Sequence, residues 1–417
     1  MSEDIKIPYE LPEGWKWCCW GDIGKFVAGN GFKEKFQGFT NLNIPFYKVG
    51  SLKFSDSYGI LYDRTNTINE DILKELKANL IPTNSIIFAK IGEAIRLNRR
   101  SLNSEPCCID NNLMAFICTE CNYKYVFYWS KSLDLYNYTN ATTVSAIRKS
   151  DLENILFPLP PTLEEQQRIV NRIETLFAKL DQAKEKAQNV VDTFETRKAS
   201  ILHKAFTGEL TKKWREENGV GDDSWEKKKL EECGKWERGR SKHRPRNAPE
   251  LFGGKYPFIQ TGDVANADVY INEHKQTLSE FGFKQSRLFP TGTLCITIAA
   301  NIGKVAILSY DCCFPDSVVG FTPNENNDSK FMYYKINEIE KDLEELAPAT
   351  AQKNLNLKLL TSVKLKVPML PEQQEIVHIL DVILEKETKV KESAEAVLEQ
   401  IDLLKKSILV RAFRGEL

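Results

Sequence analysis

Long apolar runs are absent from this 417-residue sequence. No stretch reaches the roughly 20 consecutive apolar residues that a membrane-spanning helix needs. The opening segment MSEDIKIPYELPEGW lacks the apolar core of a secretory signal. Ten cysteines are present without the spacing of a disulfide framework, so we expect reduced thiols. Together these features predict a cytoplasmic protein.

Groups that support catalysis or metal binding are also scarce. The phosphate-binding pattern G-x-x-x-x-G-K-[ST] is missing, and so is an Asp/Asn-Pro-Pro-aromatic tetrapeptide that would hold a flipped adenine. Cys118 and Cys121 form a single C-x-x-C pair, whereas a structural zinc site needs four ligands. The four histidines are scattered, at His203, His243, His274 and His378. We therefore expect no catalytic residue, metal site or bound cofactor in this chain.

Neither sign of charge dominates the composition. The sequence has 57 Lys and Arg residues against 58 Asp and Glu residues, a formal net charge of −1. Any surface that binds nucleic acid must therefore be local. A chain of this length can form two or three domains with ample core.

The sequence contains a long internal repeat. Residues 163–210 return as residues 370–417, aligned without a gap and identical at 20 of 48 positions. Both copies begin with Glu and paired Gln and end in Ala-Phe-x-Gly-Glu-Leu. Each runs without Pro or Gly from that Glu to Gly208 or Gly415, where a helix C-terminal glycine is expected.

Both copies carry apolar residues at alternating steps of three and four. The first seam contains Ile169, Ile173, Leu176, Leu180, Val190, Phe194 and Ile201. The second contains Ile376, Leu380, Ile383, Val390, Val397, Ile401, Leu404 and Ile408. Each seam is broken once, at Arg197 and at Glu387. A 3.5-residue period over more than four heptads predicts two helices of about 40 residues that pair as a coiled coil.

The remaining sequence divides into two α+β domains. We predict a first domain over residues 1–158, a helical region over 159–210, a polar linker over 211–224, a second domain over 225–367 and a second helical region over 368–417. In the first domain, strands are expected over 44–49, 85–89 and 113–118 and helices over 67–78 and 124–136. Thr162 is the expected N-cap of the first long helix.

The two domains are related more weakly than the helices. Trp15 and Gly24 pair with Trp225 and Gly234 at an offset of 210, while the Cys107-Cys108 pair matches Cys312-Cys313 at an offset of 205. The drifting offset indicates a shared scaffold whose loops differ in length. Loops that vary on a constant scaffold suit a protein that reads two different things.

Several segments resemble the specificity subunit of type I restriction-modification systems. They are LPEGWKW, PPTLEEQQRIV, LPEQQEIV, AFTGELTKKWRE, AFRGEL, YPFIQTGDV and ANIGKVAI, and jointly they cover essentially the whole chain. The resemblance implies two target-recognition domains held by an antiparallel coiled coil with pseudo-two-fold symmetry. Each domain would read one half of a gapped DNA sequence. One departure is that no counterpart of TKKWREENG follows the second repeat.

The resemblance also implies the partners. The helices would space the half-sites and dock two modification (methyltransferase) subunits, with restriction (ATP-dependent translocase and nuclease) subunits in the full complex. S-adenosylmethionine, ATP and Mg²⁺ would be bound by those partners and not by this chain. A pseudo-symmetric reader should bind half-sites whose centres lie about 10 bp apart.

The segment Lys235–Arg246, KWERGRSKHRPR, is the strongest local basic signal. Its glycine and proline predict a loop, and arginines on a loop can contact phosphates or guanine. The expected DNA-binding residues are Arg238, Arg240, Lys242, His243, Arg244 and Arg246. On charge alone, a solvated surface loop is the alternative.

Weaker candidates lie elsewhere in both domains. In the first domain they are Lys33, Lys35, Lys90 and Arg96, with Arg99 and Arg100 nearby; in the second they are Asn301 and Lys304. Gln352 and Lys353 belong to a polar stretch before the last strand, which occupies the same place as residues 139–150 of the first domain. These residues can equally be exposed strand faces or capping loops. A helical adaptor without DNA recognition is the alternative function.

Overall fold

The computed structural model describes residues 7–140, 145–299, 301–346 and 355–417. It contains two compact units, one of residues 1–188 with 395–417 and one of residues 189–394. Within the described ranges, no helix is long and apolar enough to cross a membrane.

The first unit is built on a five-stranded sheet of order β2-β9-β6-β7-β4. Its strands are β2 (Gly24–Ala28), β9 (Leu113–Cys118), β6 (Ile86–Ala89), β7 (Arg100–Asn103) and β4 (Ile60–Leu61). A smaller sheet has the order β5-β3-β8, from Thr67–Ile68, Ile44–Tyr47 and Cys108–Ile109. The helices are α1 (Glu70–Leu76), α2 (Tyr123–Ser132) and α3 (Lys149–Glu153). Buried aromatics such as Trp20, Phe88 and Phe116 form the core between α2 and the larger sheet.

The second unit repeats this plan with a five-stranded sheet of order β12-β20-β17-β18-β14. Its strands are β12 (Gly234–Arg238), β20 (Val318–Pro323), β17 (Leu294–Thr297), β18 (Val305–Leu308) and β14 (Tyr270–Ile271). The smaller sheet, β15-β13-β19-β16, is formed by Gln276–Leu278, Phe252–Phe258, Cys312–Cys313 and Leu288–Phe289. The helices are α7 (Thr261–Asn266), α8 (Glu280–Lys284), α9 (Ser329–Glu338), α10 (Glu340–Glu345) and α11 (Leu357–Thr361). Two tandem α+β domains, as predicted, are confirmed.

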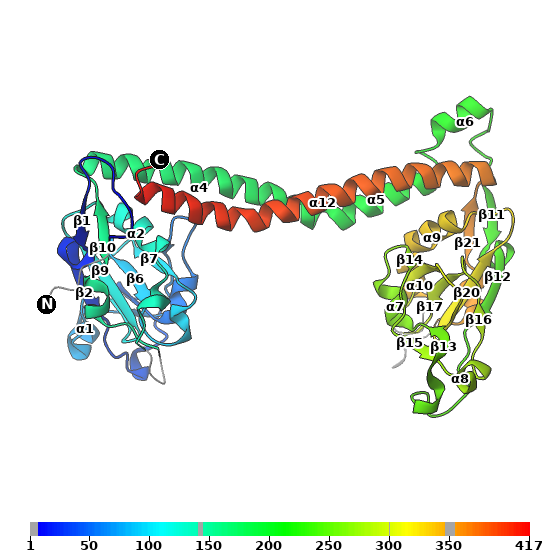
Figure 1. Cartoon of the computed structure of the whole chain (residues 1–417), viewed down its shortest axis with the longest axis horizontal. Coiled ribbons are helices and arrows are strands. Elements are labelled where there is room, and N and C mark those ends of the chain that lie inside the picture. The colour runs from blue at the N-terminus through cyan, green and yellow to red at the C-terminus, as the bar shows by residue number, and fades with distance from the viewer. Residues whose placement is uncertain (1–6, 141–144, 300, 347–354) are drawn as a thin grey trace. The chain divides into compact units, whose positions relative to one another are not determined.

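The long helices are α4 (Leu163–Asp192), α5 (Phe194–Phe206) and α12 (Leu370–Phe413). In the first unit α4 lies antiparallel beside the last part of α12, where Asp181 Oδ1 meets Lys405 Nζ at 2.5 Å. In the second unit α5 lies antiparallel beside the first part of α12, where Glu387 Oε2 meets Arg197 Nε at 2.7 Å (Figure 1). The two residues that interrupt the apolar seams therefore contact each other.

The first helical repeat is interrupted at Thr193, where a single helix was expected. The Thr193 hydroxyl donates to the carbonyl of Asn189 at 2.6 Å. A threonine that bonds the carbonyl four residues back tends to bend a helix. Thr162 does cap the start, since its hydroxyl accepts from the Glu165 amide at 3.2 Å.

Burial along the seams differs from the expectation in α12. Ile169, Ile173, Ile376, Leu380 and Ile401 are at most 2% exposed. Val390, Val397 and Leu404 are 50%, 41% and 47% exposed, although their spacing predicts a buried seam. Two paired helices cover only a narrow strip of each other. An apolar residue outside that strip stays exposed to water unless another element packs over it. The other predicted seam residues, Leu176, Leu180, Val190, Phe194, Ile201, Ile383 and Ile408, are partly buried.

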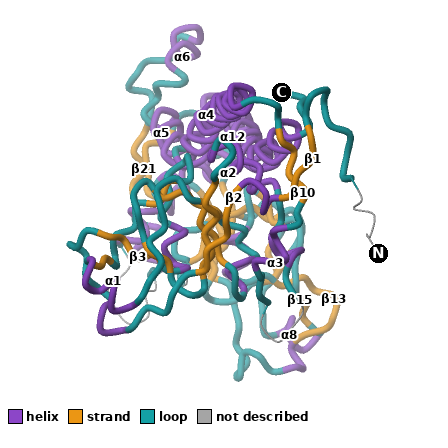
Figure 2. Tube along the Cα trace, turned by 90° about the vertical axis from the view of Figure 1, so that its left-hand side faces the viewer, coloured by secondary structure: helices purple, strands orange, loops and turns teal. Residues whose placement is uncertain are grey.

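Short two-stranded ribbons join each domain to its long helix. In the first unit β1 (Lys16–Cys19) pairs with β10 (Leu156–Leu159), which leads into α4. Figure 2, where this unit faces the viewer, shows the ribbon rising to the helices. In the second unit β11 (Glu226–Lys229) pairs with β21 (Lys364–Val367), which leads into α12.

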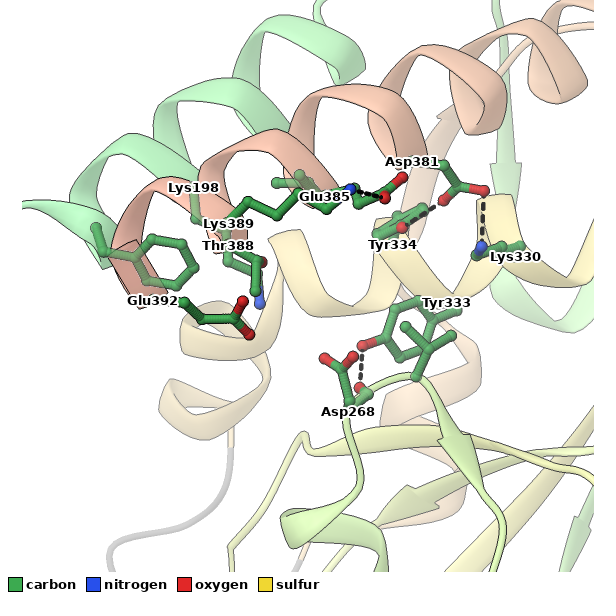
Figure 3. A pocket seen from close by; sticks show the side chains of 13 residues that line it. Lys198, Asp268, Lys330, Tyr333, Tyr334, Asp381, Glu385, Thr388, Lys389 and Glu392 are labelled. Atoms are coloured by element: carbon green, nitrogen blue, oxygen red, sulfur yellow. Dashed lines mark hydrogen bonds and ion pairs between the residues drawn. The ribbon is translucent and has the colours of Figure 1, made fainter. Parts of the chain in front are cut away.

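The same polar cluster fastens each domain to its helix. Lys330 Nζ and the Tyr334 hydroxyl, both on α9, bind the Asp381 carboxylate at 2.7 Å (Figure 3). Burial and the bond to Asp381 both raise the pKa of Tyr334. In the first unit Lys124 and Tyr128 on α2 bind Glu174 at 2.9 and 3.3 Å. These are the corresponding positions of the repeat, so the duplication extends to individual side-chain contacts.

The paired glutamines of the repeat have a structural role. Gln166 and Gln373 are at most 2% exposed, and their Oε1 atoms accept from the N-cap amides of the packed helices. The N-caps are Asn122 of α2 and Asp328 of α9, at 2.8 and 2.9 Å. Each glutamine therefore fixes the start of a domain helix against the long helix.

The segment predicted to be a polar linker contains helix α6 (Lys212–Asn218). Arg215 of this helix is 7% exposed at its side chain and binds Glu372, which is fully buried, at 2.8 Å. The Thr211 hydroxyl and the Trp225 indole donate to the same Glu372 oxygen. Burial disfavours the charged form of Arg215, but the bonds to Glu372 and Asp222 outweigh it and raise its pKa. This part of the chain is thus anchored to the first turn of α12.

Candidate nucleic-acid interface

The candidate interface in each unit is the sheet end where three chain segments meet. In the second unit these are the loop after β12, the turn 314–318 before β20 and the loop after β17. The amide of Gly239 donates to Val318 O at 2.9 Å and that of Ile298 to Ser317 O at 3.0 Å. Val318 N closes the turn on Pro315 O at 3.0 Å.

The first unit has the same hydrogen bonds at the corresponding positions. The amide of Gly29 donates to Leu113 O, that of Lys90 to Asn112 O and that of Leu113 to Asp110 O, at 3.2, 2.9 and 3.0 Å. The strand registers also correspond, because Ala28 faces Met114 as Arg238 faces Val319. The two sheet ends are therefore one scaffold carrying different side chains.

Gly29 and Gly239 allow this close packing. A Cβ at Gly239 would lie 2.2 Å from Pro315 O, and a Cβ at Gly29 would lie 1.9 Å from Asp110 O. No side chain fits at such distances from a backbone oxygen. The glycines therefore set where the variable loop leaves each sheet.

We predict that Gly239→Ala displaces the basic loop and lowers the free energy of unfolding by about 1–2 kcal/mol, as overpacking usually does. Urea unfolding would measure the loss. Gly262→Ala is the matched control, since a Cβ there meets no atom within 4 Å. Equal stability of Gly239→Ala and wild type would show that the turn 314–318 shifts to accommodate the added methyl group at little cost in free energy.

The basic segment presents its cations at this sheet end. Arg238 is the last residue of strand β12, where a loop was expected, and the other cations lie in the loop that follows. Arg238 Nε donates to Asp316 O at 2.5 Å, and Arg246 Nη2 to Asp316 Oδ2 at 2.7 Å. Arg244 donates to the backbone oxygens of Ser241 and His243 at 2.8 Å. Of the candidates, Arg238, Lys242, Arg244 and Arg246 are exposed, and Arg240 and His243 are partly buried. His243 lies 3.7 Å from Glu250 and packs edge-on against Phe281.

The other candidates of the second unit are less available. Lys304 Nζ binds Glu340 at 2.7 Å. Asn301 adopts a left-handed conformation with φ +55°, and its carbonyl accepts from the Thr297 hydroxyl, which closes the loop after β17. Gln352 and Lys353 lie outside the described residues.

In the first unit the candidates are spread around the sheet end. Lys33 and Lys35 both face Glu75, at 3.8 and 2.6 Å, and the hydrogen bond from Lys35 lowers the pKa of Glu75. Arg96 binds Glu93 at 3.0 Å and lies over the Tyr136 ring at 3.8 Å. Lys90, at the end of β6, has no side-chain partner among the described residues.

One basic residue of this region is structural. Arg100 is 3% exposed and donates to the carbonyls of Asn98 and Leu133. Burial lowers the pKa of Arg100 to about 9. Its place within the pattern RLNRR suggested surface charge, but as part of β7 it points inward. Its neighbour Arg99 is exposed.

Sequence reasoning missed Asp316, which organises the basic loop. Its position in the turn before β20 corresponds to Asn111 of the first unit, so the two copies differ at this point. No motif marks an acidic residue beside a basic loop. The structure also gives no group of three or more His, Cys, Asp or Glu side chains suited to a metal, within the ranges it describes.

A repeated scaffold with a long helix after each copy and divergent loops at one sheet end defines a two-part recognition protein. The sequence model described as "Type I restriction modification DNA specificity domain" matches residues 12–191 and 222–400. The chain therefore belongs to the family of type I restriction modification DNA specificity proteins.

Individual relatives are distant in sequence. The chain is 24% identical to the type I restriction enzyme EcoBI specificity subunit of Escherichia coli, over 67% of this chain and 62% of that protein. It is 26% identical to the Escherichia coli EcoDI specificity subunit, over 66% and 65%. The chain thus spans slightly less than two thirds of these relatives.

Among solved structures, the HsdS subunit from Thermoanaerobacter tengcongensis has the same fold. The TM-score is 0.71 at 20% identity, and the alignment covers 98% of this chain and 99% of that one. The agreement over nearly the full length of both chains confirms the tandem architecture.

Proposed function

We propose that this chain is the non-catalytic specificity subunit of a type I restriction-modification complex. Each unit reads one half of a bipartite, gapped DNA sequence with the loops at its sheet end. The observation that carries this proposal is the duplicated sheet end, where equivalent backbone hydrogen bonds hold loops of different charge. A constant scaffold with variable loops allows two unrelated half-sites to be read by one chain.

The proposed partners are double-stranded DNA, two modification subunits and, in the full complex, restriction subunits. The long helices supply their docking surface and determine the spacing of the half-sites. Methylation of adenine N6 with S-adenosylmethionine, and ATP- and Mg²⁺-dependent cleavage, take place on those partners. The complex would work in the cytoplasm, where it defends the host against unmodified DNA.

Mapping methylated bases tests this function directly. The chain is co-expressed with the modification subunit of its system, and N6-methyladenine is located across host DNA by long-read sequencing. We expect a gapped motif with one methylated adenine on each strand, about 10 bp apart. An assembled complex that produces no motif would contradict DNA recognition and favour a helical adaptor. An ungapped motif would show that one unit alone reads DNA.

Salt dependence gives a second, independent prediction. Binding of the complex to a random duplex should weaken steeply as salt rises, because each phosphate contact releases condensed counterions. A slope of log affinity against log salt near zero would exclude a protein–phosphate interface. Fluorescence anisotropy at several salt concentrations measures this slope.

A further inference from the structure

The cations at the end of β12 and in the loop after it are in two different states. Arg238 and Arg246 are held by the backbone and the side chain of one residue, Asp316. The side chains of Arg240 and Lys242 have no partner within the described residues. Reading a base requires a side chain held in place, whereas a phosphate contact tolerates a mobile one. The structure therefore separates the candidates.

The anchor of Arg238 is itself fixed. Asp316 lies in the turn 314–318, which is hydrogen-bonded to the loops after β12 and β17. Phe314 at the start of this turn is fully buried and stacks on Phe289, with 3.9 Å between ring centroids. An arginine bound to such a turn loses less side-chain entropy on reaching DNA than a free one.

The bond to Asp316 leaves the recognition edge of Arg238 open. Among the described residues only Nε is engaged, so the two terminal nitrogens keep their outward donors. Two parallel N–H groups match the O6 and N7 acceptors of guanine in the major groove. Arg246 differs, because its Nη2 is engaged by the Asp316 carboxylate and its charge is already paired.

The first unit lacks this arrangement. Ala28 occupies the position of Arg238 in the strand register, and Asn111 occupies that of Asp316 in the turn. The contrast is confined to side chains, because the backbone hydrogen bonds of the two sheet ends correspond. A guanine contact at this place would therefore be specific to the second half-site.

We propose that Arg238 reads a guanine in the half-site of the second unit, and that Arg240 and Lys242 contact phosphates. This assignment rests on the proposed function and adds the residue and the base to it. Asp316 acts as the positioning residue, through its carbonyl for Arg238 and through its carboxylate for Arg246.

The test compares full-length Arg238→Ala, Arg238→Lys and Arg240→Ala, each assembled with the modification subunit and mapped for N6-methyladenine. The wild-type motif should contain a guanine that both Arg238 variants cease to select, with preference falling roughly tenfold or more at that position alone. Arg238→Lys keeps the charge but lacks the two parallel N–H groups. It therefore tests the same assignment if Arg238→Ala fails to assemble. Arg240→Ala should keep the motif. In the anisotropy measurement it should reduce the slope of log affinity against log salt by about 1.

Each alternative outcome is informative. An unchanged motif with uniformly weaker methylation in both Arg238 variants would make Arg238 a phosphate contact and overturn the assignment. A changed base preference in Arg240→Ala would overturn it as well. A wild-type complex without any motif would refute the function itself, and that result is visible before any substitution is made.

Discussion

Replacing Arg215 with alanine should lower the free energy of unfolding of the second unit by about 3–5 kcal/mol. The reason is that Glu372 is fully buried, and its ion pair with Arg215 spans 2.8 Å. Removing one partner of a buried pair leaves an uncompensated charge, which costs far more than the pair itself contributes. Within the part of the chain that the structure describes, the Thr211 hydroxyl and the Trp225 indole would remain as donors to that oxygen.

Urea unfolding, monitored by hydrogen exchange in residues 211–232 and 370–380, would measure this loss in free energy of unfolding. Asp222→Ala is the matched control, because Asp222 binds the same arginine but is 83% exposed at its side chain. Its effect should stay below about 1 kcal/mol, as for other exposed pairs. A similar loss in both variants would mean that Glu372 is stabilised without Arg215.

The architecture was predictable because its signals are long and repeated. A 48-residue repeat with a sustained 3.5-residue period leaves few alternatives to paired helices. Conserved glycine spacing between the domains reflected a real constraint at Gly24 and Gly234, where a Cβ would lie 2.3 Å from a backbone oxygen of the neighbouring strand. Such steric requirements act locally, so the sequence records them.

The chemistry of the interface was less predictable because it depends on pairs that are distant in sequence. Arg238 and Asp316 are separated by 78 residues, and Arg215 and Glu372 by 157. Composition counts an arginine as positive whether it is exposed, paired or buried, and Arg100 illustrates the buried case. The sequence located the basic loop, and only the fold distinguishes its anchored cations from its free ones.

The residues that interrupt the apolar seams of the long helices also form a pair that is distant in sequence. Arg197 and Glu387 are each a single charged residue in an otherwise apolar seam. Neither repeat alone gives a reason for its charged residue. In the structure they form one ion pair, with side chains 33% and 26% exposed. At the corresponding positions of the first unit the sequence has Leu404 and Leu180. One unit thus places a charge pair where the other places two leucines.

Replacing Glu387 alone with leucine should therefore destabilise the second unit by about 2–3 kcal/mol, since Arg197 would keep its bonds to Val190 O and the Thr193 hydroxyl but lose the carboxylate that balances its charge. The double variant Arg197→Leu/Glu387→Leu should recover this loss, because it removes both charges and places leucine at both positions, as the first unit does at Leu404 and Leu180. Buried ion pairs replaced by apolar residues of similar volume are often neutral or stabilising.

Urea unfolding of the wild type, both single variants and the double variant completes a double-mutant cycle. We expect a coupling free energy of about 1–3 kcal/mol, whereas residues that do not interact give values near zero. Lys389→Leu is the control, because its 2.5 Å pair with Glu385 lies within one helix and is about two-thirds exposed. Additive losses in the cycle would show that Arg197 and Glu387 act independently. Strong coupling would show that the two charges interact across α5 and α12, and a shift of either helix by one residue would break that interaction.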